Sequence, residues 1–121
     1  IAIHDGVRPL IDSSTIERCF AEAERSGAAI PVIDLIDSIR KLKTGKSKAV
    51  NRSDYKLAQT PQVFKSEIIL KSYEQSFSEA FTDDASVVEA AGYSVNLVEG
   101  TRENIKITTA LDLKLAEAFL I

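Results

Sequence analysis

Two short apolar segments flank a helical pattern at the start of the chain, and this order constrains the fold more than any other feature. Residues 1–3 are apolar and lead into a polar turn, and residues 28–33 form a second apolar run. Between them, Ser13 or Ser14 can cap a helix that Gly27 can end. A strand, a helix and a strand at this spacing form a β-α-β crossover. We therefore predict an α/β fold with a parallel sheet.

The middle of the chain, residues 34–60, lacks helical periodicity. Thr44-Gly45-Lys46-Ser47 is turn-like and separates two short stretches of mixed polar and apolar residues. This pattern predicts a two-stranded β-arm that projects from the sheet. Because two strands alone are marginally stable, we expect the arm to pack on another surface, and a second subunit is the simplest candidate.

Basic residues concentrate in this arm. Residues 40–56 carry seven Lys or Arg side chains against Asp54, a net charge of +6, which leaves −9 for the rest of the chain. A basic segment on an acidic body suits a compact anionic ligand better than a nucleic acid, because nucleic-acid-binding domains are usually basic overall. A solvated lysine-rich hairpin explains most of these lysines equally well.

The second half of the chain continues the alternation of helices and strands. The pattern predicts a helix from Ser66, a helix from residues 82–84 to Gly92, a strand over residues 93–98, a short strand over residues 105–107 and a helix over residues 109–120.

The composition limits the setting in which the chain works. Of its 121 residues 45% are hydrophobic, but no apolar run approaches the roughly 20 residues of a membrane span, so we expect a cytoplasmic protein without a membrane partner. The single Cys19 excludes an internal disulfide and is expected to pack in the core. The sequence opens on Ile1 and contains no Met, so we interpret it as a fragment or a processed piece.

Four residues outside the arm stand where chemistry is expected. Asp5 and Arg8 follow the first strand, at the end of the sheet where ligands bind, and their spacing fits either a polar ligand or an internal pair. Thr82 lies at a helix start that suits both an anion and simple capping. Lys106 lies between two isoleucines and therefore points to solvent or to a cleft. His4 is a possible general base, although a single His is more often structural.

Five segments, taken in order, resemble the 2-C-methyl-D-erythritol 4-phosphate cytidylyltransferase family of the non-mevalonate isoprenoid pathway. They are HDGVRP, IPVIDLIDSIRK, NRSDYKLAQTPQVF, TDDASVVEAAG and LVEGTRENIKITT. The resemblance implies a Rossmann-like nucleotidyltransferase fold with three α/β/α layers, of which residues 1–121 would be the C-terminal part of a single domain. Residues 34–60 would be its dimerising β-arm.

The resemblance also implies a substrate site that is shared between two subunits. One chain would contribute Asp5, Arg8, Thr82 and Lys106, and the arm of its neighbour would contribute Ser38, Arg52 and Thr60. Lys106 is the expected catalytic residue. Ser38 stands where the family often has threonine and keeps the hydroxyl, and Asn51 stands where an acid usually precedes the arginine.

The implied reaction is attack by the acceptor's phosphate oxygen on the α-phosphorus of CTP, with loss of pyrophosphate and with the aid of Mg²⁺. The family's glycine-rich loop, which holds the CTP phosphates, does not occur in these 121 residues. We therefore expect an inactive fragment with no metal site of its own, a homodimer through its arm, and CTP and 2-C-methyl-D-erythritol 4-phosphate as ligands of the whole enzyme. The alternatives are a ribitol-5-phosphate cytidylyltransferase and a non-catalytic dimerisation module.

Overall fold

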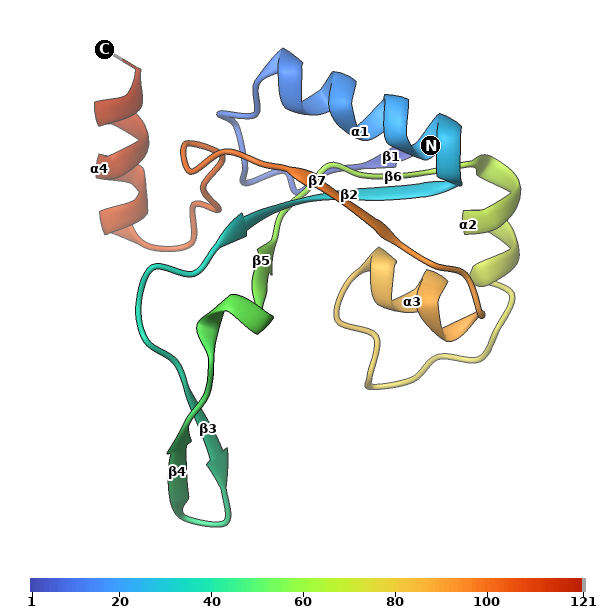
Figure 1. The fold of residues 1–121 in the computed structure, drawn as a ribbon. Helices are drawn as coiled ribbons and strands as arrows, with labels where there is room; N and C mark the ends of the chain where they lie inside the picture. The colour runs from blue at the N-terminus through green and yellow to red at the C-terminus, as the bar shows by residue number, and fades with distance from the viewer. Residues whose placement is uncertain (121) are drawn as a thin grey trace.

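A seven-residue strand, β2 (Ala28–Asp34), forms the centre of a five-stranded sheet in the computed structural model, which describes residues 1–120. Along one edge β2 pairs with β6 (Gln62–Phe64) and β5 (Lys56–Ala58), both antiparallel. Along the other edge it pairs with β7 (Asn96–Glu99), which is parallel. The strand β1 (Ala2–Ile3) lies on the far side of β6 (Figure 1).

The sheet is therefore mixed, and the prediction of a parallel sheet was wrong. The strands β1 and β2 run in the same direction, as a crossover requires, but β6 lies between them and is antiparallel to both. A crossover determines the relative direction of its two strands but leaves room for another strand between them. The chain fills that place when it returns from the arm.

Helices cover both faces of the sheet (Figure 1). On one face α1 (Ser13–Ser26) buries Cys19 and Ala23 against Ala29 and Val63. On the other face α2 (Ser66–Ser72) and α3 (Asp84–Ala90) enclose a second cluster, made of Ala28, Phe64, Ile69 and Val88. Because both clusters include residues of β2 and β6, these two strands connect the layers.

The helix ends show how far the local signals were correct. The N-cap of α1 is Asp12, whose carboxylate accepts from Thr15 N at 3.2 Å, so the prediction of Ser13 or Ser14 was one or two residues late. Gly27 ends the helix as expected, with φ of 102°. The last helix, α4 (Ala110–Phe119), also begins as predicted, with Thr109 as its N-cap.

Two of the strand predictions were inaccurate. The strand predicted over residues 93–98 begins only at Asn96, as β7. Residues 105–107 form no strand; a single backbone hydrogen bond, from Ile107 N to Val7 O at 2.8 Å, ties this segment to the turn after β1. Alternating polarity alone gives no sheet when the neighbouring segment is a turn, because a strand needs a continuous partner.

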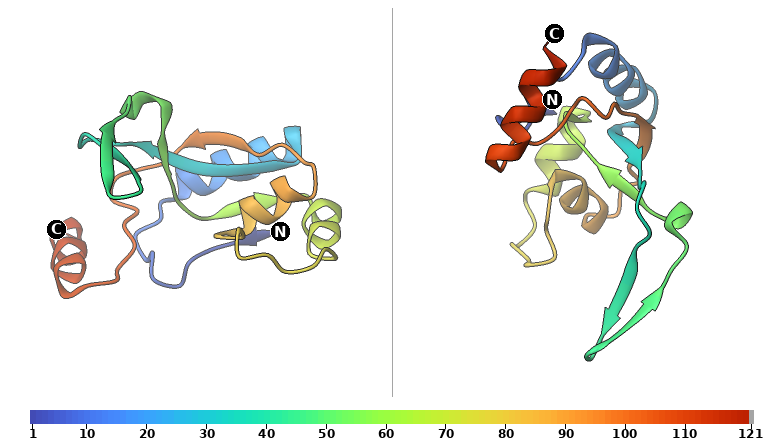
Figure 2. Two further views of the ribbon diagram at one scale, coloured as in Figure 1. Left: turned by 90° about the horizontal axis from the view of Figure 1, so that it is seen from below. Right: turned by 90° about the vertical axis from the view of Figure 1, so that its left-hand side faces the viewer.

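Part of the predicted arm, residues 34–60, is present as a hairpin that projects away from the sheet (Figures 1 and 2), whereas Asp34 and residues 56–58 pair within the sheet. The hairpin consists of β3 (Arg40–Lys43) and β4 (Lys46–Ala49), followed by a 3₁₀ turn, η1 (Arg52–Asp54). Thr44 and Gly45, at φ of 46° and 74°, form the tight turn between the strands. Positive φ at both positions matches the twist of a two-residue hairpin. Among residues 1–120, no helix is long and apolar enough to cross a bilayer.

Candidate functional site

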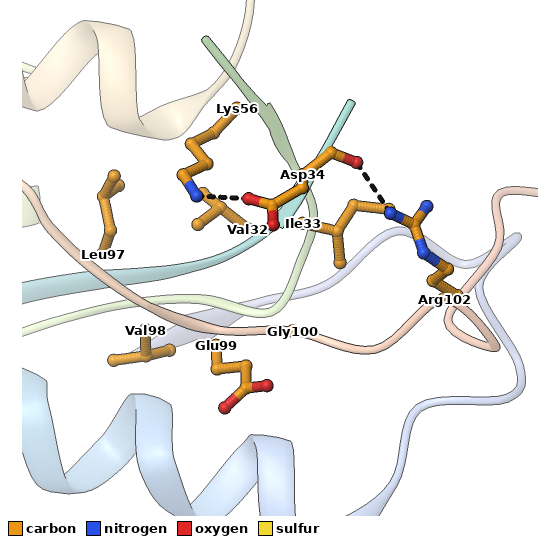
Figure 3. A pocket seen from close by; sticks show the side chains of 9 residues that line it. All are labelled: Val32, Ile33, Asp34, Lys56, Leu97, Val98, Glu99, Gly100 and Arg102. Atoms are coloured by element: carbon orange, nitrogen blue, oxygen red, sulfur yellow. Dashed lines mark hydrogen bonds and ion pairs between the residues drawn. The ribbon is translucent and has the colours of Figure 1, made fainter. Parts of the chain in front are cut away.

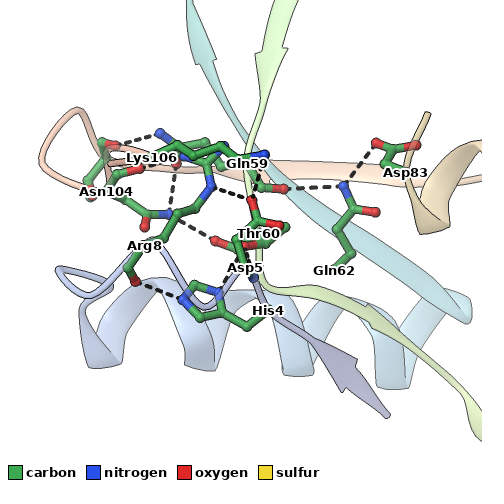
Figure 4. Close-up of polar contacts among 10 residues, drawn as sticks. His4, Asp5, Arg8, Gln59, Thr60, Gln62, Asp83, Asn104 and Lys106 are labelled. Atoms are coloured by element: carbon green, nitrogen blue, oxygen red, sulfur yellow. Dashed lines mark hydrogen bonds and ion pairs between the residues drawn. The ribbon is translucent and has the colours of Figure 1, made fainter. Parts of the chain in front are cut away.

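A polar pocket of about 370 Å³ lies where β1 and β5 end and α3 begins (Figure 4). Five of the seven residues predicted as substrate-binding line it: Asp5, Arg8, Thr60, Thr82 and Lys106. They come from four separate segments of the chain, which the fold brings to one place. The remaining lining residues are Ala58, Gln59, Gln62, Asp83 and Asp84.

Asp5 is the acidic centre of the polar pocket. Its carboxylate accepts a hydrogen bond from Arg8 Nε at 3.0 Å and lies 3.8 Å from Lys106 Nζ. Arg8 also donates from Nη1 to Asn104 O at 2.8 Å, and its side chain is only 12% exposed. Two cations and one acid leave this cluster with a charge of about +1 at neutral pH. The internal pair that the spacing allowed is thus present, and it holds both cations at the pocket.

Thr60 links the two sides of the polar pocket through its hydroxyl. Thr60 Oγ1 accepts from Asp5 N at 3.0 Å and lies 2.9 Å from His4 Nδ1, while His4 Nε2 lies 2.8 Å from Arg8 O. A neutral imidazole that is protonated on Nε2 satisfies all these contacts. His4 therefore holds the turn together, as its structural interpretation predicted. Because Thr60 contacts residues of its own chain, its assignment to a neighbouring subunit was wrong.

Two buried amides, Gln59 and Asn104, support the polar pocket from behind. Asn104 Nδ2 donates to Gln59 Oε1 at 3.2 Å and to Thr60 O at 2.9 Å, and Gln59 Nε2 donates to Thr101 O at 2.8 Å. Asn104 is fully buried, and its Oδ1 has no hydrogen-bond partner among the described residues. Through these contacts the segments that carry Thr60, Arg8 and Lys106 are fixed to each other.

Gly100 lies against the same amides. A Cβ atom at position 100 would lie 2.5 Å from Gln59 Oε1 and 3.1 Å from Val32 O. The close approach of the loop after β7 to Gln59 therefore requires glycine at this position. Sequence reasoning missed Gln59, Asn104 and Gly100. All three lie within the segments that resemble the family, and this position is the one sign of their role that the sequence offered.

The start of α3 forms another wall of the pocket. Asp83 accepts from Ser86 N at 2.8 Å and from Gln62 Nε2 at 3.0 Å, and Gln62 Oε1 accepts from Ala85 N at 2.9 Å. The capping interpretation of this segment is thus confirmed. Thr82 is exposed just before the cap, with its backbone N–H bonded to Ser86 Oγ at 3.0 Å.

Ser38 and Arg52 lie outside the polar pocket. Both are exposed and belong to the arm. Arg52 lines a separate hollow with Asp34, Tyr55 and Lys56 at the base of the hairpin. Within this chain, therefore, the structure unites five of the predicted residues and leaves two apart.

A larger hollow, of about 510 Å³, lies beside β7 and holds none of the predicted residues (Figure 3). Two of its cations contact Asp34: Lys56 pairs with the Asp34 carboxylate, and Arg102 Nη2 donates to the backbone Asp34 O at 3.0 Å. Cys19, the one thiol, is buried away from both hollows, and burial raises its pKa to about 11. It stays protonated at neutral pH, and its predicted packing role is confirmed.

Comparisons with known proteins agree on one assignment. A protein of Bacteroides fragilis is 57% identical over 120 residues, and one of Bacteroides thetaiotaomicron is 52% identical over 120 residues; both are named 2-C-methyl-D-erythritol 4-phosphate cytidylyltransferase. The crystal structure of the enzyme of that name from Thermus thermophilus superposes with a TM-score of 0.85 at 35% identity. The superposition covers 98% of this chain and 60% of the Thermus chain.

These matches place the fold in the class of α/β cytidylyltransferases. The profile of one family, 2-C-methyl-D-erythritol 4-phosphate cytidylyltransferase, matches residues 1–121. The chain belongs to that family. The matches include 99% of this chain but only 55% of each Bacteroides relative. The chain therefore spans about half the length of these relatives.

Proposed function

We propose that the chain supplies the acceptor-binding half of a cytidylyltransferase that transfers CMP from CTP to 2-C-methyl-D-erythritol 4-phosphate, and that it corresponds to the C-terminal part of that enzyme. The observation that carries this proposal is the polar pocket, in which three acids, two cations and two hydroxyls converge. The names of the relatives support the choice of substrates.

The chemistry of the pocket suits a phosphorylated polyol. Arg8 and Lys106 approach Asp5 from two directions, so an acceptor phosphate can lie between the guanidinium and the ammonium. The Asp5 carboxylate keeps acceptor capacity for a sugar-alcohol hydroxyl, and Thr82 offers a further hydroxyl at the rim. A ligand with one phosphate and several hydroxyls uses both kinds of group.

In the proposed reaction an oxygen of the acceptor phosphate attacks the α-phosphorus of CTP. A new P–O bond forms, the bond from the α-phosphorus to the oxygen bridging to the β-phosphate breaks, and pyrophosphate leaves. Because two anions must approach each other, positioning and charge neutralisation supply most of the catalysis. Arg8 and Lys106 would provide both on the acceptor side.

The CTP side of the site is assigned to residues outside this chain. The five glycines, at positions 6, 27, 45, 92 and 100, are far apart and form no glycine-rich phosphate loop. The Mg²⁺ that the family resemblance implies would be bound outside this chain, together with CTP. No group of three or more His, Cys, Asp or Glu side chains within residues 1–120 could hold a metal ion, so these residues do not fit a Mg²⁺ site of their own.

The neighbouring subunit would complete the acceptor side with Arg52 and Ser38. Both lie on the projecting arm, outside the polar pocket of their own chain. A homodimer in which each arm reaches the other's pocket would give the exposed guanidinium of Arg52 an anionic target.

Calorimetric titration of 2-C-methyl-D-erythritol 4-phosphate into the chain tests the proposal. We expect saturable heat that Arg8→Ala and Lys106→Ala reduce at least about tenfold in affinity, since a charged hydrogen bond contributes about 1.5–3 kcal/mol. Lys114→Ala on α4 removes an equal charge outside the pocket and is the control. Absence of heat would favour a dimerisation module, and tighter binding of ribitol 5-phosphate would change the acceptor.

A separate assay tests the division of the active site. With CTP, Mg²⁺ and acceptor, the mass-verified chain should show background turnover only, and activity should appear when the other half of a family member is added. Turnover by the chain alone would show that its own cations bind the triphosphate, and would overturn the assignment of CTP to residues outside it.

A further inference from the structure

The partners of the Thr60 hydroxyl determine the direction in which its hydrogen points. His4 Nε2 lies 2.8 Å from Arg8 O, and because a carbonyl oxygen only accepts, Nε2 carries a proton in this contact. In the neutral imidazole the other nitrogen, Nδ1, is then an acceptor, and it lies 2.9 Å from Thr60 Oγ1. The Thr60 hydroxyl therefore donates its hydrogen to His4 (Figure 4).

The same oxygen of Thr60 keeps one position for a ligand. Thr60 Oγ1 accepts from Asp5 N at 3.0 Å, and no third partner contacts it within residues 1–120. A hydroxyl has one donor hydrogen and two acceptor lone pairs. One lone pair is thus left over, on a residue that lines the polar pocket. Towards a ligand, Thr60 can accept a hydrogen bond but cannot donate one.

The backbone on both sides of this contact is anchored. Thr60 is 8% exposed, and its carbonyl oxygen accepts from Asn104 Nδ2 at 2.9 Å. The turn that follows His4 is closed by a hydrogen bond from Arg8 N to Asp5 O at 3.1 Å. His4 itself is exposed, so a substitution there opens no cavity in the core. A change at His4 can therefore alter the Thr60 hydroxyl and leave the fold intact.

The acceptor character of Thr60 distinguishes the two ends of a polyol phosphate. A fully ionised phosphate offers only acceptor oxygens, so it cannot pair with the free lone pair of Thr60. It can pair with Arg8 and Lys106, whose side chains supply donors and positive charge in the same pocket. An alcohol hydroxyl, by contrast, can donate to Thr60. The pocket thus has different partners for the alcohol end and for the phosphate end.

We propose that His4 is a positioning residue: it keeps the Thr60 hydroxyl as an acceptor for an alcohol group of the ligand, and so directs the phosphate towards Arg8 and Lys106. The proposal deepens the proposed function, on which it rests, because it assigns the two ends of the acceptor molecule to different residues. His4 then has two separable contacts, one that orients Thr60 and one that ties the turn at Arg8 O.

Two substitutions of His4 separate these contacts. In His4→Asn the amide oxygen is as many bonds from Cβ as Nδ1 is, so it can still accept from Thr60, but the contact with Arg8 O is lost. In His4→Gln the amide nitrogen matches Nε2 and can still donate to Arg8 O, but Thr60 loses its acceptor. If His4 only tied the turn, His4→Asn would be the more harmful change. If it orients Thr60, His4→Gln is the more harmful one.

Chemical-shift titration of the ¹⁵N-labelled chain compares the variants with two ligands, 2-C-methyl-D-erythritol 4-phosphate and inorganic phosphate. We expect His4→Gln to weaken binding of the polyol phosphate about threefold to tenfold, the value of one neutral hydrogen bond. Its affinity for inorganic phosphate should change less than about twofold, and His4→Asn should restore wild-type affinity for the polyol phosphate. Equal losses for both ligands in His4→Gln, or a larger loss in His4→Asn, would overturn the proposal.

The same labelled chain gives a test that needs no ligand. His4 is the one histidine of the sequence, so the imidazole ¹⁵N resonances belong to it alone. In the neutral ring Nε2 should carry the proton and Nδ1 should show the shift of a hydrogen-bonded acceptor, which Thr60→Val should abolish while Nε2 stays unchanged. A proton on Nδ1, or no response to Thr60→Val, would overturn the direction assigned to the hydroxyl. A wild-type chain with these signals that binds neither ligand would instead overturn the proposed function.

Discussion

The polar pocket and the arm carry the two parts of the predicted substrate site, and they are held in opposite ways. The pocket's Thr60 and Arg8 are fixed by hydrogen bonds to Asn104, which is fully buried. Every residue from 40 to 49 in the arm is exposed, and only the ladder and two hydrogen bonds from Arg40 to Ser47 hold the hairpin. The chain thus builds its own pocket, whereas the position of the arm depends on what it contacts.

Truncation of an apolar residue in each region should give the largest contrast. Phe64, the last residue of β6, is 1% exposed and belongs to the cluster with Ile69 of α2, so Phe64→Ala should lower the free energy of unfolding by about 3–5 kcal/mol. Leu42 is 80% exposed in the arm, and Leu42→Ala should change it by less than about 0.5 kcal/mol. Urea denaturation of both variants measures this difference. A large loss in Leu42→Ala would show that the arm contributes to a core.

A polar replacement tests the same contrast at the site. Asn104→Leu leaves Gln59 Oε1 and Thr60 O without the donor that now satisfies them, so we expect a loss of about 2–3 kcal/mol in unfolding free energy. Asn51→Leu, at an exposed asparagine of the arm, should cost about 1 kcal/mol or less. Equal losses in the two variants would contradict the view that the pocket alone is built on buried amides.

Removal of the arm's arginine should affect binding and leave folding intact. In the complete enzyme, Arg52→Ala is expected to raise the KM of the acceptor about tenfold or more, with the KM of CTP and the unfolding free energy nearly unchanged. Steady-state kinetics with each substrate varied in turn measures both constants. If the acceptor KM does not change, Arg52 has no role at the partner's pocket.

A mixed dimer adds a control for that result. Subunits carrying Arg52→Ala, mixed with subunits mutated at Asp5, should recover part of the activity, since one of the two shared sites then has both contributions intact. No recovery would place Asp5 and Arg52 at the same site of one chain.

The smallest expected effect separates a charged helix cap from an uncharged one. The hydrogen bond from the Thr15 hydroxyl lowers the pKa of Asp12. The ionised carboxylate therefore stabilises α1 fully at pH values above the ordinary Asp pKa of about 3.9, and this stabilisation is lost as the pH falls through the lowered pKa. Asp12→Ala should therefore cost about 1 kcal/mol at pH 7 and less at pH 2.

In the arm, Asn51 caps η1 without a charge, through Ser53 N at 3.1 Å. The cost of Asn51→Ala should accordingly not depend on pH. Thermal unfolding of both variants across this pH range compares the two caps, and a pH-independent cost of Asp12→Ala would show that its charge adds nothing.

Features that depend on a few neighbouring residues could be predicted from the sequence. Gly27 as a helix end, Thr109 as a helix start and the turn at Thr44 and Gly45 all follow from backbone preferences of single residues. The resemblance of five segments, rather than any one residue, identified the family and gathered Asp5, Arg8 and Lys106 into one site.

The errors came from contacts between distant segments. The position of β6 between β1 and β2 depends on pairs far apart in the sequence, such as Ala2 with Val63 and Ala28 with Phe64, which no local pattern specifies. The place of Thr60 in its own chain's pocket has the same origin. Gln59 and Asn104 appeared as ordinary polar residues, because burial of an amide is visible only when its partners are known.

The hydrogen bonds of the polar pocket also determine when it can form during folding. Asp5 N reaches Thr60 across 55 positions and Arg8 reaches Asn104 across 96, so the pocket closes loops that span most of the chain. Such long-range contacts form slowly compared with a helix. During synthesis, therefore, we expect a nascent chain to have α1 well before it has a phosphate site. Pulsed hydrogen exchange should find the Ile16 amide of α1 protected before that of Asp5.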